Sequence, residues 1–312
     1  MQSYKHKKRF FGTLCVVVSA ALIVHLIWRI DMKRATVILN QASYGWLVAA
    51  LLVTCCNPLF TVWRWMGVLR AQKGIQLGFS TALRANLMAN VLNSLLPSKA
   101  GDAAKAIYLR KHGGLVRGMG TVILERSVDF MVLGILGITG YLTSGVTYGL
   151  ITGLVLLGGI SCIFLTVFLV PLHRLPLPAG ILEKVETIPQ VYKSWIKSPG
   201  AILQTVLASL CCWSMGGLIV CCLVSALNTG VTWGYVYGIF PTAILAGLVP
   251  LTVGGVGTRD SAFVFFLVGR MPLEEATLVG LGYTLFAYWL LSLISLPAVF
   301  WELVSYFRRN DG

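Results

Sequence analysis

Long apolar runs separated by short polar segments dominate the chain. Six of these runs are close to the ~20 residues that an α-helix needs to cross the hydrocarbon core of a bilayer. They predict membrane-crossing helices at about residues 10–29, 44–69, 118–143, 147–171, 202–227 and 276–302. The pattern indicates an all-α polytopic membrane protein.

Two further apolar segments, 82–110 and 232–270, are interrupted near their middles by proline, glycine and charged residues. The first interruption reads LPSKAGD over residues 96–102, and the second reads VPLTVGGVGTRD over residues 249–260. Irregular backbone at membrane depth is stable only where protein or a wet cavity satisfies its polar groups. Paired interruptions in the two halves of a chain are typical of transporter binding sites. We therefore predict two oppositely facing re-entrant helical hairpins, as in an inverted repeat, whose breaks face each other near the bilayer midplane.

Basic residues give the expected orientation, because cytoplasmic loops of membrane proteins are enriched in Lys and Arg. With both termini in the cytoplasm, fifteen basic residues fall inside and four outside. Those inside are Lys5, Lys7, Lys8, Arg9, Arg70, Lys73, Arg110, Lys111, Arg117, Arg174, Lys184, Lys193, Lys197, Arg308 and Arg309. Those outside are Arg29, Lys33, Arg34 and Arg270. The first hairpin then opens to the cytoplasm and the second to the outside.

Composition excludes a soluble domain. The 312 residues are 57% hydrophobic and 12% charged, with a mean hydropathy of +0.81. We expect one transmembrane domain over residues 1–312, in a prokaryotic cytoplasmic (inner) membrane, and no nucleic-acid partner. The apolar run after the basic N-terminus is too long for a typical signal peptide, which favours an uncleaved first helix. Residues 172–201 form the one sizeable polar stretch, either a helix in the headgroup region or a plain cytoplasmic connector.

The eight cysteines include three adjacent pairs inside apolar runs, at 55–56, 211–212 and 221–222. This spacing differs from that of zinc and redox sites and is typical of small buried hydrophobic residues. No metal and no cofactor is implied.

Ten ionisable residues fall at or near membrane depth, where each costs roughly 2.5–3.5 kcal/mol unless water or a partner compensates it. The basic ones are Arg64, Arg84, Lys99, Lys105, Arg126 and Arg259. The acidic ones are Asp102, Glu125, Asp129 and Asp260. The excess of positive charge favours an anionic guest.

Glu125 and Asp129 lie four residues apart, on one face of a helix. Two interpretations are open for this pair. In the structural one, Arg126 extends to the cytoplasmic end of the helix and the carboxylates pair with Arg64 or Arg84. In the functional one, the carboxylates hold a cavity arginine, or exchange a proton or a cationic group of the substrate for it. A general acid and base pair is disfavoured, because no nucleophile or metal set accompanies it.

Asp102 and Asp260 are expected to cap the half-helices that follow them, since Asp is a favoured N-cap residue. Capping does not exclude a binding role. The N-terminus of a half-helix that points into a cavity attracts phosphate, and Lys99 and Arg259 would be its charged partners. The glycines at 254, 255 and 257 allow close approach of a ligand but form no P-loop.

The sequence resembles the flippase-like family of the lysylphosphatidylglycerol synthase transmembrane domain over about residues 10–302. The resemblance rests on residues of both halves: Trp63, Arg64, Arg84, Asn86, Asn90, Leu96, Pro97, Gly101, Asp102, Lys105, Glu125, Arg126, Asp129, Pro250 and the run Gly254–Arg259. Family members often carry Glu where this chain has Asp260. The resemblance implies lipid translocation rather than lysyl transfer.

These observations predict a lipid translocator and not an enzyme. Its central cationic cavity would pass the phosphate headgroup of an anionic phospholipid or of a polyprenyl-phosphate-linked lipid between the leaflets. The expected substrate-binding residues are Arg64, Arg84, Asn90, Lys99, Asp102, Lys105, Glu125, Arg126, Asp129, Thr258, Arg259 and Asp260. The alternatives are an intramembrane transferase acting on a phosphate-bearing lipid and a non-catalytic partner of an envelope-lipid enzyme. A homo-oligomer or an envelope-biosynthesis partner is compatible with either role.

Overall fold

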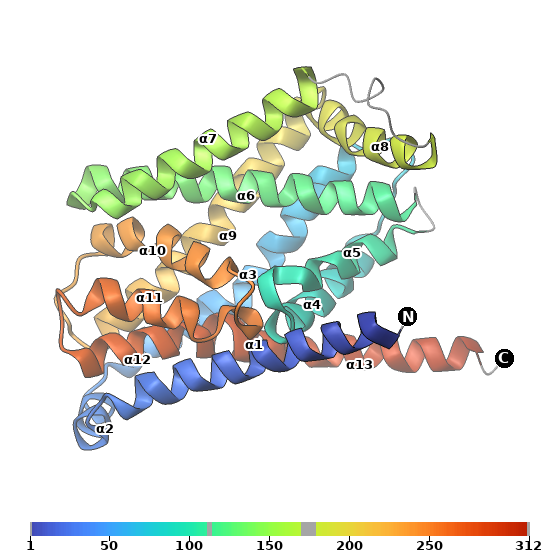
Figure 1. Cartoon of the computed structure of the whole chain (residues 1–312). Helices are drawn as coiled ribbons and strands as arrows, with labels where there is room; N and C mark the ends of the chain where they lie inside the picture. Colours follow the sequence, from blue (N-terminus) through green and yellow to red (C-terminus); the bar gives the residue numbers. More distant parts are fainter. Residues whose placement is uncertain (1, 111–113, 170–178, 311–312) are drawn as a thin grey trace.

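The fold is all-α, as predicted. A computed structural model describes residues 2–110, 114–169 and 179–310, and all regular elements in these ranges are helical (Figure 1). Lys111, Arg174 and the first part of the expected connector, up to residue 178, lie outside the described residues.

Six long helices coincide with the six predicted apolar runs. They are α1 (Gln2–Trp28), α3 (Tyr44–Arg70), α6 (Leu115–Ser144), α7 (Thr147–Leu169), α9 (Pro199–Ala226) and a last helix made of α12 (Leu273–Thr284), a π-helical turn (Leu285–Leu290) and α13 (Leu291–Asn310). Among the described residues, four of these have the length and apolarity of a membrane span: α3, α7, α9 and the last helix. A fifth candidate is the pair of α1 and α2 (Met32–Asn40), which is bent by 82°.

Helix α6 is as long as the others but is not among these candidate spans. Its first half carries Arg117, Glu125, Arg126 and Asp129. Such residues in a helix between other helices are stable only with partners inside the protein. The polarity of α6 therefore marks a helix whose charged face is covered by the rest of the bundle.

Part of the expected connector is a helix, α8 (Ala179–Ile196), that packs against α6 and α9. Val191, Tyr192 and Trp195 are buried on its inner side. The Trp195 indole donates to Thr205 on α9, and the backbone carbonyl of Val191 accepts from Gln72, just beyond α3. Residues 179–196 are thus helical, and their position in the headgroup region stays a prediction.

Both interrupted segments consist of two short helices joined by irregular backbone. The first comprises α4 (Phe79–Leu95), a 3-10 turn (Pro97–Asp102) and α5 (Ala103–Tyr108), and the second comprises α10 (Trp233–Leu248), a 3-10 turn (Val253–Gly255) and α11 (Thr258–Leu267). We call residues 96–102 the first break and 249–257 the second break. Pro97 ends α4 because a residue before proline, here Leu96 (φ −113°, ψ 147°), is driven to extended backbone.

The two breaks contact each other. The N–H of Gly254 donates to the carbonyl of Leu96 across 3.3 Å. Gly254 has a φ of +60°, and a Cβ at this position would lie 3.1 Å from the carbonyl oxygen of Ser94. Glycine is therefore required here both for the backbone conformation and for the close approach.

Figure 1 shows how these elements are arranged. Helices α6 and α7 run along one side of the molecule and α1 and α13 along the other, with α3 and α9 crossing between them. The α4–α5 unit and the α10–α11 unit occupy opposite ends of the intervening space. The start of α1, the end of α13, and α5 and α8 lie at one end, whereas α2, the α6–α7 turn and the α11–α12 turn lie at the other.

Candidate functional site

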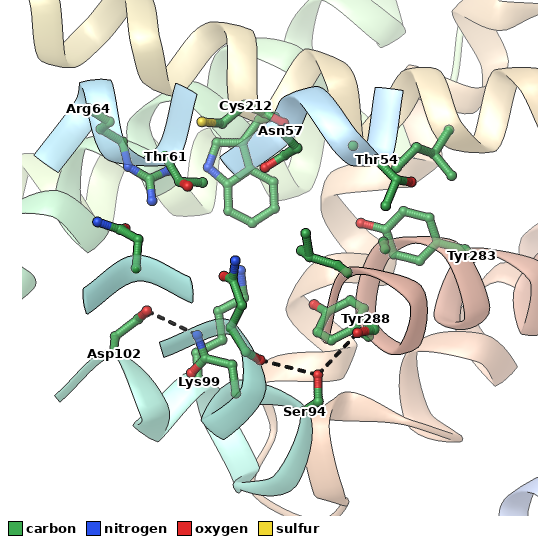
Figure 2. Close-up of a pocket in the computed structure, with 18 of the residues that line it drawn as sticks. Thr54, Asn57, Thr61, Arg64, Ser94, Lys99, Asp102, Cys212, Tyr283 and Tyr288 are labelled. Atoms are coloured by element: carbon green, nitrogen blue, oxygen red, sulfur yellow. Dashed lines mark hydrogen bonds between the residues drawn. The ribbon is translucent and has the colours of Figure 1, made fainter. Parts of the chain in front are cut away.

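The first break borders a cavity inside the bundle (Figure 2). The volume of the cavity that water can occupy is about 100 Å³. Figure 2 shows Thr61 and Arg64 on one wall, Lys99 and Asp102 on the opposite wall, and Tyr288 at the side. Among the described residues that line the cavity, none belongs to α10, the second break or α11.

Two polar helix faces form part of the cavity wall. Residues spaced by three or four positions share one face of a helix, and both faces follow this spacing. The α3 face consists of Thr54, Asn57, Thr61 and Arg64, and the α4 face consists of Asn86, Asn90 and Asn93. Such polar stripes inside apolar helices indicate a hydrated surface rather than a contact with lipid.

Arg64 is held by both carboxylates of α6. Its Nε donates to Oε1 of Glu125 (2.8 Å) and its Nη1 donates to Oδ1 of Asp129 (2.7 Å). The exposed fractions of Glu125 and Asp129 are 0% and 1%, and the Ser209 hydroxyl also donates to Asp129. The carboxylates therefore pair with Arg64, and not with Arg84, of the two arginines considered for them.

Two more cations join the same carboxylates. The Lys105 ammonium lies 3.0 and 3.1 Å from the two carboxylate oxygens of Glu125. Nη2 of Arg126 lies 3.1 Å from Glu125 and 3.0 Å from Asp129, and its Nε lies 3.5 Å from Oδ2 of Asp102. Asp102 is also 3.8 Å from the Lys105 ammonium and accepts from the Asn93 amide.

We call Arg64, Asp102, Lys105, Glu125, Arg126 and Asp129 the ion network. Its three cations and three carboxylates give a formal charge of zero. A buried carboxylate that loses its partners, or a cation that loses its carboxylate, leaves an uncompensated charge. The balance therefore stabilises six ionisable groups in a place where each alone would be costly.

Lys99 stands apart from this network. Among the described residues its ammonium makes no ion pair or hydrogen bond, and it lies 4.6 Å from the centroid of the Trp213 ring. Its backbone has a φ of +55°, which is uncommon for a residue with a side chain. The first break thus places an unpaired cation at the cavity wall, over an aromatic face that attracts cations.

Arg259 is placed differently from the expected phosphate ligand. It is 1% exposed and does not line the cavity. Its Nη1 donates to the carbonyl of Gly254, its Nη2 donates to Thr284, and its guanidinium stacks 3.8 Å from the centroid of the Tyr288 ring. The Tyr283 ring centroid lies 5.2 Å from the same guanidinium, and both tyrosines line the cavity, so Arg259 borders the cavity through these two rings.

Asp102, at the end of the first break, and Asp260, shortly after the second break, have different roles. The N-cap of α11 is Gly257 and not Asp260, which is the third residue of the helix. The Asp260 carboxylate accepts from the N–H of Gly257 (2.8 Å) and from the Thr284 hydroxyl, so it stabilises the start of α11 from inside the helix. Asp102 makes no capping bond to the backbone of α5 and instead belongs to the ion network. The expected cap at Asp102 is therefore absent, because three side chains, Asn93, Lys105 and Arg126, hold its carboxylate.

Two other predicted site residues lie away from the cavity lining. Arg84 pairs with Glu302 of α13, with 3.2 Å between Nη1 and Oε1. The Thr258 hydroxyl bonds within the second break, to Thr252 and to the carbonyl of Gly255. The remaining predicted residues are at the cavity or in the ion network: Arg64, Asn90, Lys99, Asp102, Lys105, Glu125, Arg126 and Asp129.

Sequence reasoning did not identify several cavity residues, namely Thr54, Asn57, Thr61, Asn93, Trp213, Tyr283 and Tyr288. The α3 and α4 residues had a signal in their helical spacing. Tyr288 had none, since it lies in the π-helical turn, and a π-turn shifts the helix face by a residue.

Residues 13–295 match the family model described as the lysylphosphatidylglycerol synthase TM region. The chain belongs to this family. Membership makes it an integral membrane protein linked to lipid handling, which confirms the resemblance noted from the sequence. None of the curated proteins compared with the chain matches it.

We predict that Glu125→Gln destabilises this family member strongly. Glutamine leaves Arg64, Lys105 and Arg126 with one carboxylate fewer, and an uncompensated buried charge costs ~3–5 kcal/mol. Thermal unfolding of the purified protein in detergent measures the effect. The matched control is Glu274→Gln, at a carboxylate outside the ion network, which should change stability by less than about 0.5 kcal/mol. Equal melting temperatures for the two variants would contradict the assigned role of the ion network.

We predict that Arg259→Lys lowers stability by about 1–3 kcal/mol, because lysine keeps the charge but loses the planar stacking and the forked donors. Lipid affinity per folded molecule should stay at the wild-type level. The control is Arg270→Lys, at an exposed arginine that also lies over a tyrosine ring, 5.0 Å from Tyr235. A variant with wild-type stability and weakened lipid binding would instead place Arg259 in the binding site.

Proposed function

We propose that the protein translocates a lipid with an anionic phosphate headgroup, a phospholipid or a polyprenyl-phosphate-linked lipid, between the membrane leaflets. The observation that carries this proposal is the unpaired Lys99 ammonium on the wall of a polar cavity whose other charges are balanced. A single uncompensated cation in a protected cavity attracts an anion. The headgroup would pass through the cavity while the lipid tails stay in the bilayer.

In this proposal α4–α5 and α10–α11 are re-entrant hairpins that open to opposite sides of the membrane. Support comes from the chain ends and loops: α8, the end of α5 and the ends of α1 and α13 share one end of the molecule (Figure 1). The segments at that end carry the larger share of Lys and Arg, and are therefore cytoplasmic in the proposal. Both termini are then inside.

Each hairpin would act as a gate for one side. The contact between the breaks consists of few bonds, among them the one from Gly254 to Leu96. At the end of α4, the Ser94 hydroxyl lies 2.6 Å from the Ser292 hydroxyl and donates to the carbonyl of Tyr288. Movement of α4 away from the last helix would break these bonds and open the cavity.

The ion pairs that the carboxylates make within the protein favour transport over the transferase alternative. A general base needs a carboxylate that is free to take a proton from the substrate. Asp102, Glu125 and Asp129 each lie within 4 Å of cations of the protein. These contacts favour a role in holding cations over one in acid and base chemistry.

We predict that a cross-link between α4 and the last helix stops translocation. In the double variant Ser94→Cys/Ser292→Cys the sulfur atoms replace hydroxyls 2.6 Å apart, close to the ~2.05 Å of a disulfide. Flux of a fluorescent phosphatidylglycerol between the leaflets of proteoliposomes should fall to the protein-free rate after oxidation and return after reduction.

Each single cysteine variant serves as a control and should keep its flux under both conditions. Full flux through protein whose cross-link is verified by mass spectrometry would contradict gating by α4. A wild-type flux equal to that of protein-free vesicles would overturn translocation itself.

We predict opposite labelling of the two loops that end the hairpins. Arg110, after α5, and Arg270, after α11, are both exposed. With an impermeant maleimide on sealed vesicles of known orientation, Arg110→Cys should react only from the cytoplasmic side and Arg270→Cys only from the external side. The wild-type chain, with its own cysteines, gives the background. Reaction of both variants from the same side would exclude opposed re-entrant hairpins.

A further inference from the structure

Outside the ion network, four polar groups of the described cavity wall have no partner, and they indicate which headgroup the cavity takes. This inference rests on the proposed function and concerns the same cavity. The groups are the Lys99 ammonium, Nδ2 of Asn90, Nε1 of Trp213 and Oδ1 of Asn93, and all four residues line the cavity. Trp213 and Asn93 are each only 8% exposed. Buried polar groups usually have partners, so these four are suited to a ligand.

Three of the four groups are donors. An ammonium and an indole N–H can only donate, and so can the Nδ2 of an amide. A ligand that satisfies them must present acceptor atoms, as the oxygens of a phosphate do. The described part of the cavity wall therefore provides donors from α4, the first break and α9 for one acidic group.

The charge balance limits that group to a single negative charge. The ion network is neutral, so Lys99 supplies one net positive charge. A phosphodiester carries one negative charge at neutral pH, whereas a phosphomonoester carries about 1.5 to 2. The second charge of a monoester would lie uncompensated near Asp102, whose carboxylate also lines the cavity.

The remaining part of the headgroup has to be uncharged and able to donate a hydrogen bond. An ammonium group needs a free carboxylate. Among the described residues that line the cavity, the carboxylate is Asp102, which already lies 3.8 Å from Lys105 and 3.5 Å from Arg126. The one unpartnered amide acceptor, Oδ1 of Asn93, suits a hydroxyl. Leaving such a buried acceptor without a donor is unfavourable.

We propose that the ligand of this cavity is a phosphodiester lipid whose headgroup is uncharged and bears hydroxyls. Two sources carry this chemistry: a glycerophospholipid with a polyol headgroup, and a polyprenyl chain joined through phosphate to a sugar. Lys99, Asn90 and Trp213 contact the phosphate, and Asn93 accepts from a headgroup hydroxyl.

Binding of short-chain lipids to the purified protein in detergent tests the proposal. The probes are dioctanoyl phosphatidylglycerol, phosphatidylethanol, phosphatidylethanolamine and phosphatidic acid, and geranyl phosphoglucose as the polyprenyl-type diester. Phosphatidylglycerol or geranyl phosphoglucose should bind about tenfold or more tightly than phosphatidic acid and phosphatidylethanolamine. Phosphatidylethanol, a diester without a hydroxyl, should bind roughly fivefold or more weakly than the hydroxylated diester. The tighter of the two hydroxylated probes identifies the source.

Variants link the selectivity to the named groups. Lys99→Met should lower the affinity for the hydroxylated diester by about tenfold or more, and Lys99→Arg should restore most of it. The matched control is Lys73→Met, the same change at an exposed lysine outside the cavity. Trp213→Phe keeps an aromatic ring but removes the N–H together with the five-membered ring of the indole, and should weaken binding by a smaller factor. Melting temperatures of all variants show whether each one is folded.

The outcomes separate this proposal from translocation. Tightest binding of phosphatidic acid would overturn the phosphodiester assignment, and tightest binding of phosphatidylethanolamine would overturn the uncharged headgroup. Equal binding of all probes, or an unchanged affinity in folded Lys99→Met, would overturn the proposal as a whole. Selective binding without flux in proteoliposomes would support the assignment and refute translocation. Flux of phosphatidylglycerol and phosphatidylethanolamine at equal rates would support translocation and refute the headgroup assignment.

Discussion

Backbone that leaves a helix inside an apolar bundle must find hydrogen-bond partners within the protein, and this constraint explains the position of α1. An unsatisfied polar group costs several kcal/mol where no water is present. The second break has its partners on α1: the Ser19 hydroxyl accepts from the N–H of Val253, and the Cys15 thiol donates to the carbonyl of Pro250. Leu22 of α1 packs against Gly257. The first helix therefore covers a break that lies more than two hundred residues further along the chain.

The first break is held in place by ion pairs instead. Asp102 is part of the ion network, and the network joins the first break to α3, α5 and α6. A buried charge network contributes little net stability but penalises any arrangement in which one member is displaced. This difference explains why the two breaks, so similar in sequence, are held in different ways. One is fixed by neutral hydrogen bonds and a stacked arginine, and the other by ions that also border the cavity.

Much of this arrangement follows from the sequence by simple rules. The apolar runs gave the long helices, because helix length in a membrane is set by bilayer thickness. Pro97 and Pro250 located the breaks, and the spacing of Glu125 and Asp129 placed them on one face. The partner of each charged side chain could not be predicted in this way, because it depends on how the helices pack. Arg259 illustrates this: its sequence position after a glycine-rich run suggests a phosphate ligand, but the π-turn brings Tyr288 over its guanidinium.

The aromatic residues of the cavity could not be predicted by these rules, because their positions also depend on how the helices pack. Trp213 lies in an apolar helix like any core residue, and only the positive φ of Lys99 brings an ammonium over its ring. A left-handed backbone at a lysine has no reliable sequence signature. Asp102 and Asp260 look equivalent in sequence, yet different side chains surround them. Asp102 joins the ion network, whereas Asp260 accepts from the N–H of Gly257 and from the Thr284 hydroxyl.

Helix α6 has a mechanical consequence for the whole molecule. It approaches both broken units through glycines: a Cβ on Gly118 would lie 2.9 Å from Ala106 of α5, and one on Gly140 would lie 2.3 Å from the backbone of Gly238 in α10. Close-packed backbone leaves no space at either contact. Neither broken unit can therefore move toward α6 without displacing it.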